Sequence, residues 1–64
     1  MTQYRLVLNT KWFVEDVDNI RAALRKRRPL TMICADLNRD RPTMDYNIGE
    51  LIAFCERNGI VVPR

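Results

Sequence analysis

Residues 44–60 have the sequence MDYNIGELIAFCERNGI, and they carry the clearest periodic pattern in the chain. Apolar side chains recur there every three or four residues, so one face of a helix collects them. These side chains are Met44, Ile48, Leu51, Ile52 and Cys55, with Phe54 widening the stripe. The pattern predicts a helix from Met44 to Asn58 with Thr43 as its N-cap. Gly59 supplies the positive φ that commonly ends a helix, and we expect Ile60 to fold back toward Cys55.

Two further helices are predicted upstream of this stretch. The first begins near Glu15, has apolar residues at helical spacing and reaches Arg28, because Pro29 cannot continue it. Acidic residues in its first turn and basic residues in its last turn complement the helix dipole. The second helix is shorter, and it is predicted from Thr31, as N-cap, to about Leu37.

Two short strands are predicted near the ends of the chain. Residues 4–9 alternate imperfectly and are rich in strand-favouring types, and residues 60–62 are β-branched and halted by Pro63. Pairing of these strands would join the two ends. The predicted fold class is therefore α+β, mostly α, with a helix-turn-helix-like three-helix core and a short two-stranded sheet. Residues 1–64 are expected to form one domain, because no repeat or linker divides them.

The predicted core combines the inward faces of these elements. It consists of Leu24, Ile33, Leu37, Ile48, Leu51, Ile52 and Cys55, with Leu6 and Leu8 from the first strand. Trp12 is also assigned to the core, since a lone tryptophan is buried more often than exposed. The alternative for Trp12 is a contact with a partner.

The composition excludes several classes of protein. With 47% hydrophobic and 30% charged residues the chain is expected to fold, because disordered chains contain fewer apolar residues. No apolar run is long enough for a membrane span, and the first residues do not resemble a secretory signal. These observations predict a cytoplasmic protein without a membrane partner.

The sequence contains few residues of the types that catalysis or metal binding requires. The chain contains Cys34 and Cys55 without a Cys-x-x-Cys spacing, and it has no histidine, so neither a zinc site nor a neutral-pH general base is visible. Both cysteines fall at apolar positions, and free buried thiols are expected. We therefore expect no enzyme, no cofactor and no small-molecule substrate.

A cluster of cations is the strongest electrostatic feature of the sequence. Between residues 21 and 41 seven basic residues stand against Asp36 and Asp40, a local balance of +5. They are Arg21, Arg25, Lys26, Arg27, Arg28, Arg39 and Arg41. Such a cluster suits phosphates or an acidic protein surface equally well, and we assign it as the candidate partner-binding surface. The alternative is a helix end that complements its own dipole.

Residues 51–62, LIAFCERNGIVV, are similar to the end of the long helix in winged-helix and helix-turn-helix domains. There the helix ends at a glycine and the chain turns into the first wing strand. The resemblance implies a recognition-helix face formed by Asp45, Tyr46, Asn47 and Glu50. Asn47 would then read adenine, yet three carboxylates on this helix, those of Asp45, Glu50 and Glu56, would be repelled by phosphates. The alternative is a solvated helix surface.

In size, charge and overall character the chain also resembles the small phage-encoded regulators that bind host RNA polymerase, of the Xanthomonas-phage inhibitor and antiterminator type. This resemblance implies a transcription regulator that binds RNA polymerase or an associated protein and inhibits or modifies transcription. The alternative is a helix-turn-helix repressor or accessory factor that binds duplex DNA, with the basic cluster on phosphates.

Overall fold

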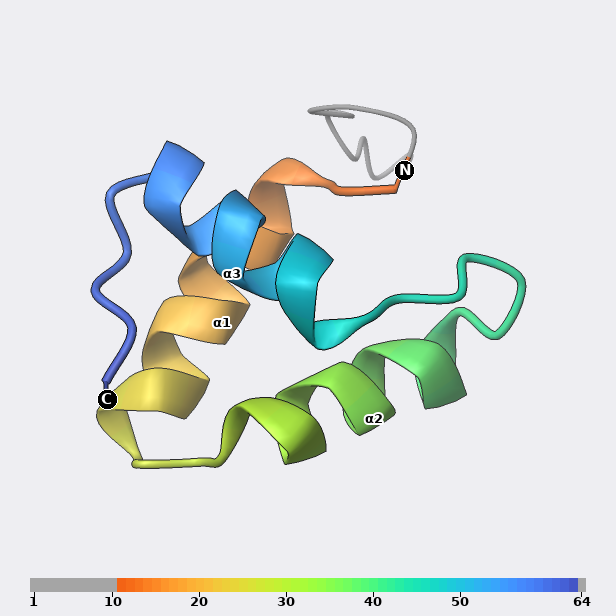
Figure 1. The fold of residues 1–64 in the computed structure, drawn as a ribbon, viewed down its shortest axis with the longest axis horizontal. Coiled ribbons are helices and arrows are strands. Elements are labelled where there is room, and N and C mark those ends of the chain that lie inside the picture. Colours follow the sequence, from red (N-terminus) through yellow and green to blue (C-terminus); the bar gives the residue numbers. More distant parts are fainter. Residues whose placement is uncertain (1–10, 64) are drawn as a thin grey trace, which may run out of the picture.

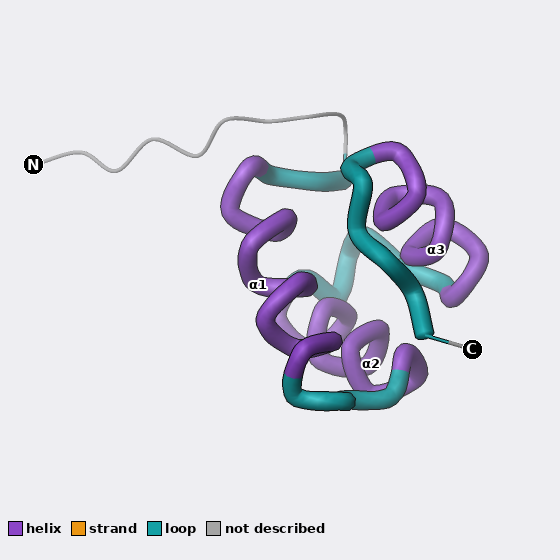
Figure 2. The backbone as a smooth tube through the Cα atoms, turned by 90° about the vertical axis from the view of Figure 1, so that its left-hand side faces the viewer, coloured by secondary structure: helices purple, strands orange, loops and turns teal. Residues whose placement is uncertain are grey.

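The structure of the protein is a computed structural model, and residues 11–63 are described. Within these residues the chain forms three helices, α1 (Val14–Arg25), α2 (Leu30–Asp40) and α3 (Ile48–Arg57), followed by a tail without regular structure (Figure 1). Helix α2 packs against both α1 and α3. The tail runs back from the end of α3 toward the corner between α1 and α2, and in Figure 2 it lies in front of the gap between α1 and α3.

The predicted two-stranded sheet is wrong, because residues 11–63 contain no strand and the described fold is all-α. Residues 60–62 are loop, although their β-branched side chains alternate as a strand would require. Ile60 is buried and Val62 packs against the core, whereas 85% of the Val61 surface is exposed. Strand propensity reflects how well alternating side chains suit a segment that is buried on one side. Here the buried side of the segment packs against helices and not against another strand. The other predicted strand, residues 4–9, lies outside the described residues.

Helices α1 and α3 end in the same hydrogen-bonding pattern. In α3 the Ile60 N–H donates to the Cys55 carbonyl at 2.8 Å and Gly59 has φ +69°, which confirms the predicted glycine cap. In α1 the Arg28 N–H donates to the Ala23 carbonyl at 3.0 Å, and the residue in the left-handed conformation is Arg27, with φ +62°. This turn ends α1 at Arg25, three residues before the predicted end.

Helix α3 begins at Ile48, four residues later than predicted. Asp45 has φ +55°, which interrupts a helix, and the main chain of Tyr46 is bound by the side chain of Asn38 from α2. The Tyr46 N–H donates to Asn38 Oδ1 at 2.7 Å, and Asn38 Nδ2 donates to the Tyr46 carbonyl at 3.0 Å. The N-cap is therefore Asn47 and not Thr43: Asn47 Oδ1 accepts a hydrogen bond of 2.8 Å from the Glu50 N–H.

Helix α2 extends three residues beyond its predicted end at Leu37. Its last residues, Asn38, Arg39 and Asp40, are polar and resemble a connection in the sequence. Polar residues add nothing to an apolar periodicity, whether they are exposed, as Arg39 and Asp40 are, or half-buried, as Asn38 is, so the pattern could not include them.

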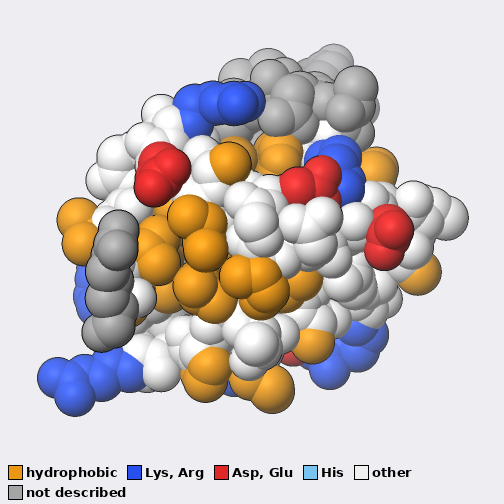
Figure 3. All heavy atoms as spheres, in the orientation of Figure 1, with side chains coloured by type: hydrophobic (Ala, Val, Ile, Leu, Met, Phe, Trp, Pro, Cys, Tyr) orange, Lys and Arg blue, Asp and Glu red, His pale blue; other side chains and the backbone are white. Residues whose placement is uncertain are grey.

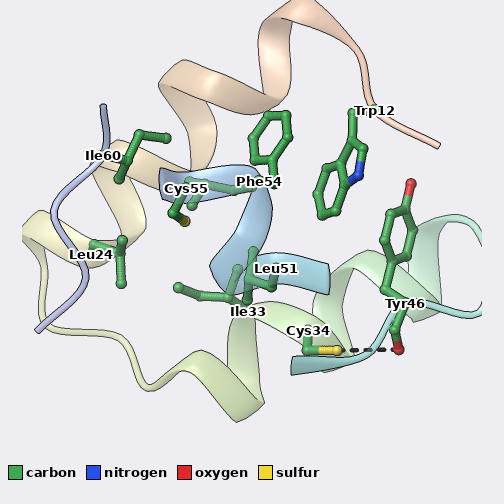
Figure 4. Packing of buried hydrophobic residues seen from close by; sticks show 10 residues of the cluster. Trp12, Leu24, Ile33, Cys34, Tyr46, Leu51, Phe54, Cys55 and Ile60 are labelled. Carbon is green, nitrogen blue, oxygen red and sulfur yellow. Dashed lines mark hydrogen bonds between the residues drawn. The ribbon is translucent and has the colours of Figure 1, made fainter. Parts of the chain in front are cut away.

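The core lies where the three helices and the tail meet (Figure 4). Of the predicted core, Leu24, Ile33, Leu51 and Cys55 are buried, and Leu37, Ile48 and Ile52 are partly buried. Leu6 and Leu8 lie outside the described residues. The core also contains Trp12, Ile20, Cys34, Tyr46, Phe54 and Ile60.

Three aromatic side chains tie the segment before α1 to the rest of the core. Trp12 is 4% exposed and stacks on Phe54 of α3 with ring centroids 4.1 Å apart, and the Tyr46 ring lies 4.9 Å away on the other side (Figure 4). The assignment of Trp12 to the core is confirmed.

Candidate functional site

Arg41, one of the seven cations of the predicted basic cluster, is bound inside the protein. Its Nη1 atom donates to Oδ2 of Asp16 and its Nη2 atom to Oδ1, both at 2.8 Å. Asp16 is 2% exposed. Nη1 also donates to the Tyr46 hydroxyl at 3.1 Å. The hydrogen bonds to Asp16 hold the pKa of Arg41 above its usual range. Arg41 therefore joins α1 to the turn before α3 and is not available to a partner.

Three other cations of the cluster have carboxylate partners at the surface. Arg28 and Arg39 both bind Asp36, the second at 2.9 Å, and the hydrogen bond from Arg28 lowers the pKa of Asp36. Arg21 lies 3.6 Å from Asp18 on the same helix. Exposed pairs of this kind typically contribute at most about 1 kcal/mol each to stability.

The remaining three cations, Arg25, Lys26 and Arg27, are exposed and have no carboxylate within ion-pair distance in residues 11–63. They occupy the end of α1 and the turn that leads to α2. The structure thus divides the predicted cluster, and we call its unpaired part, with the adjoining Arg28, the basic corner.

An apolar groove of about 770 Å³ opens beside the basic corner. Its lining comes from the end of α1, the start of α2, the start of α3 and the tail: Leu24, Arg27, Arg28, Pro29, Leu30, Thr31, Ile48 and Pro63. Figure 3 shows hydrophobic side chains gathered in the middle of the face that lies over α2, α3 and the tail, with Lys or Arg side chains at its lower left margin. The sequence did not reveal this groove, because its walls come from four separated segments.

The predicted recognition-helix face is not assembled as expected. Asp45, Tyr46 and Asn47 all precede α3, Tyr46 is 3% exposed, and the Asn47 side chain caps the helix. Glu50 is on α3, but Lys11 Nζ lies 2.7 Å from its carboxylate.

Lys11 is a residue that sequence reasoning missed. Its ammonium group also donates to the Asp45 carbonyl at 3.0 Å, and its hydrogen bond to Glu50 lowers the pKa of that carboxyl. A single lysine before a helix gives no sequence signal for such a contact, because Glu50 is 39 positions away along the chain.

The described residues offer neither a metal site nor a membrane span. Residues 11–63 contain no group of three or more His, Cys, Asp or Glu side chains placed to hold a metal ion. Cys34 and Cys55 are buried and unpaired, and burial raises the pKa of Cys55. No helix in the described part of the chain is long and apolar enough to cross a membrane.

Comparison with known proteins found no matching protein family, no similar curated protein and no similar solved structure. The class that the described residues define is a small three-helix domain. Its distinguishing surface is an apolar groove beside unpaired cations.

Proposed function

We propose that this chain is a small transcription regulator that binds a protein of the bacterial transcription machinery, RNA polymerase or a protein associated with it, and thereby inhibits or modifies transcription. The observation that carries the proposal is the apolar groove beside the basic corner. Protein interfaces combine an apolar centre with a polar rim, and Arg is enriched in them. The resemblance in size and charge to small phage-encoded polymerase-binding regulators supports the choice of partner.

Duplex DNA is the second candidate partner, and the groups that would read bases argue against it. The Asn47 carboxamide oxygen already accepts the Glu50 N–H, and Tyr46 is buried. Glu50 and Asp45 would also place negative charge near phosphates. The basic corner could still attract DNA, and such binding would be weak and independent of sequence.

A purified transcription system tests this proposal. The protein is expected to bind RNA polymerase in a pull-down that includes nuclease and to change transcript yield from unrelated promoters. The isolated protein should bind duplex DNA with a Kd of about 10⁻⁴ M or weaker at physiological salt.

Tight, promoter-specific binding of the isolated protein to DNA would overturn the proposal. The Asn47→Asp variant tests whether Asn47 reads DNA bases, because aspartate keeps the N-cap but lacks the amide group that would bind adenine. Asn47→Ala would remove the cap as well, and a loss of binding could then reflect unfolding.

A further inference from the structure

The groove has an apolar floor and a cationic side. Leu24, Leu30 and Ile48 contribute aliphatic carbon from three different helices, and Pro29 and Pro63 add two rings. Arg27 and Arg28 line the same groove. A ligand that fills it must therefore present apolar groups and negative charge within a short distance of each other.

The two arginines are presented differently. Arg28 is held by Asp36, which binds its Nε and Nη2 atoms and leaves Nη1 without a partner in residues 11–63. Such a fixed guanidinium loses little side-chain freedom when it binds a carboxylate. Arg27 is exposed and without an ion pair among the described residues, and it stands in a left-handed backbone conformation that glycine adopts at lower cost.

The tail has main-chain groups without partners among the described residues, next to the groove and directly before its lining residue Pro63. The main chain of Val61 and Val62 makes no hydrogen bond within residues 11–63, and it precedes Pro63, which lines the groove. A peptide segment lying alongside could pair with these groups, as segments do when they add to an exposed edge. A nucleic-acid backbone would meet the cations and leave the apolar floor uncovered.

We infer that the groove is the docking site for a short segment of the partner protein in which acidic and apolar side chains are interleaved. Its apolar side chains cover Leu30, Ile48 and Pro63, and its carboxylates bind Arg27 and Arg28. This inference rests on the proposed function for the identity of the partner. The chemistry of the segment follows from the groove itself.

The test uses the whole chain, labelled with ¹⁵N, and a short blocked peptide in which Asp and Leu alternate. Amide resonances of the groove-lining residues Leu24, Arg27, Arg28, Leu30, Thr31 and Ile48, and of the adjoining Val61 and Val62, are expected to shift on titration to millimolar peptide. A peptide with Lys in place of Asp should bind at least about tenfold more weakly, since several charge contacts become repulsive.

Matched variants separate the groove from general charge. Arg27→Gly removes one groove cation while suiting the local backbone, and it should weaken peptide binding by roughly threefold, the size of one exposed ion pair. Arg57→Ala removes the same charge from an exposed position on α3 that does not line the groove, and it should leave the affinity unchanged. Pro63→Ser should weaken binding, and Val61→Ser should not.

The outcomes distinguish this inference from the proposed function. Absence of shifts at millimolar peptide, shifts centred elsewhere, or equal effects of Arg27→Gly and Arg57→Ala would overturn the inference, even if the protein binds polymerase. Larger shifts of the groove resonances with a DNA duplex than with the peptide would also overturn it. Groove binding of the peptide without polymerase binding would uphold the inference and overturn the proposed function.

Discussion

Two residues hold the left-handed conformation at the ends of helices, and they differ in kind. Gly59, with φ +69°, terminates α3, and Arg27, with φ +62°, terminates α1 through the same pair of main-chain hydrogen bonds. An L residue in this conformation has its Cβ close to the following carbonyl oxygen, and glycine has no Cβ. Strain is therefore stored at Arg27 and not at Gly59.

The variant Arg27→Gly is expected to increase the free energy of unfolding by about 0.5–1 kcal/mol, because the relief of strain exceeds the added entropy of the unfolded chain. Gly59→Ala is the reciprocal change and should lower it by about 1 kcal/mol. A Cβ added at Gly59 would meet no neighbouring atom within 4 Å, so any loss there reflects the backbone and not a clash. Urea denaturation measures both values. A destabilised Arg27→Gly variant would show that side-chain contacts of Arg27 outweigh its strain.

The Asp16–Arg41 pair is the second residue-scale determinant. Asp16 is 2% exposed and the Arg41 side chain 15% exposed, and two hydrogen bonds join them. Asp16→Asn leaves the Arg41 charge partly buried without a counter-charge, and it should cost about 3 kcal/mol. Asp18→Asn removes a mostly exposed carboxylate 3.6 Å from Arg21 and should cost less than about 0.5 kcal/mol. Equal losses in thermal or urea unfolding would contradict the structural role of Arg41.

At the scale of elements, the corner between α1 and α2 is joined to α2 by Asp36. This carboxylate binds Arg28 from the corner and Arg39 from its own helix, with a distance of 2.9 Å to Arg39. Arg28, through its hydrogen bond, lowers the pKa of Asp36 below the usual value. A carboxyl with a lowered folded-state pKa stabilises the fold above its unfolded-state pKa and loses that contribution as pH falls through the folded-state pKa.

Asp36→Asn should therefore lower Tm at neutral pH. This difference in Tm from the parent protein should shrink as pH falls below about 4 and vanish once pH is below the lowered pKa of Asp36 in the folded protein. Thermal unfolding followed across this range measures the difference directly. Asp40→Asn is the matched control, because Asp40 is exposed and has no ion pair within residues 11–63. A pH-independent difference for Asp36→Asn would mean that the pair does not contribute through its charge.

At the scale of the whole molecule, the aromatic cluster links segments far apart in the chain. Trp12 stacks on Phe54, and the Tyr46 hydroxyl donates to the Lys11 carbonyl. The segment before α1 is thereby packed against α3 and the turn that precedes it. If this segment separated from α3, Trp12 would become exposed and Phe54 would lose its stacking partner.

Unfolding should accordingly be a single transition for the whole described fold. Trp12 fluorescence and far-UV circular dichroism are expected to give the same urea midpoint, because the tryptophan and the helices share one core. The midpoint should not change with reductant, since Cys34 and Cys55 are unpaired. A fluorescence midpoint at lower urea would show that residues 11–13 separate before the helices.

Local pattern determined the existence of the three helices, the glycine cap at Gly59 and the burial of Leu51 and Cys55, because apolar spacing and the freedom of glycine act within a few residues. The start of α3 depends on the local Asn47–Glu50 cap and also on the tertiary structure, because Asn38 binds the main chain of Tyr46 across eight positions.

The same holds for the candidate site. The sequence located the basic residues, but only the fold separated the buried Arg41 from the exposed Arg27 and brought Ile48 and Pro63 beside it. It also replaced the predicted sheet with a tail packed on helices. A charged or β-branched residue looks the same in the sequence whatever it contacts in the folded protein. Its contacts depend on the packing of segments that are far apart in the chain.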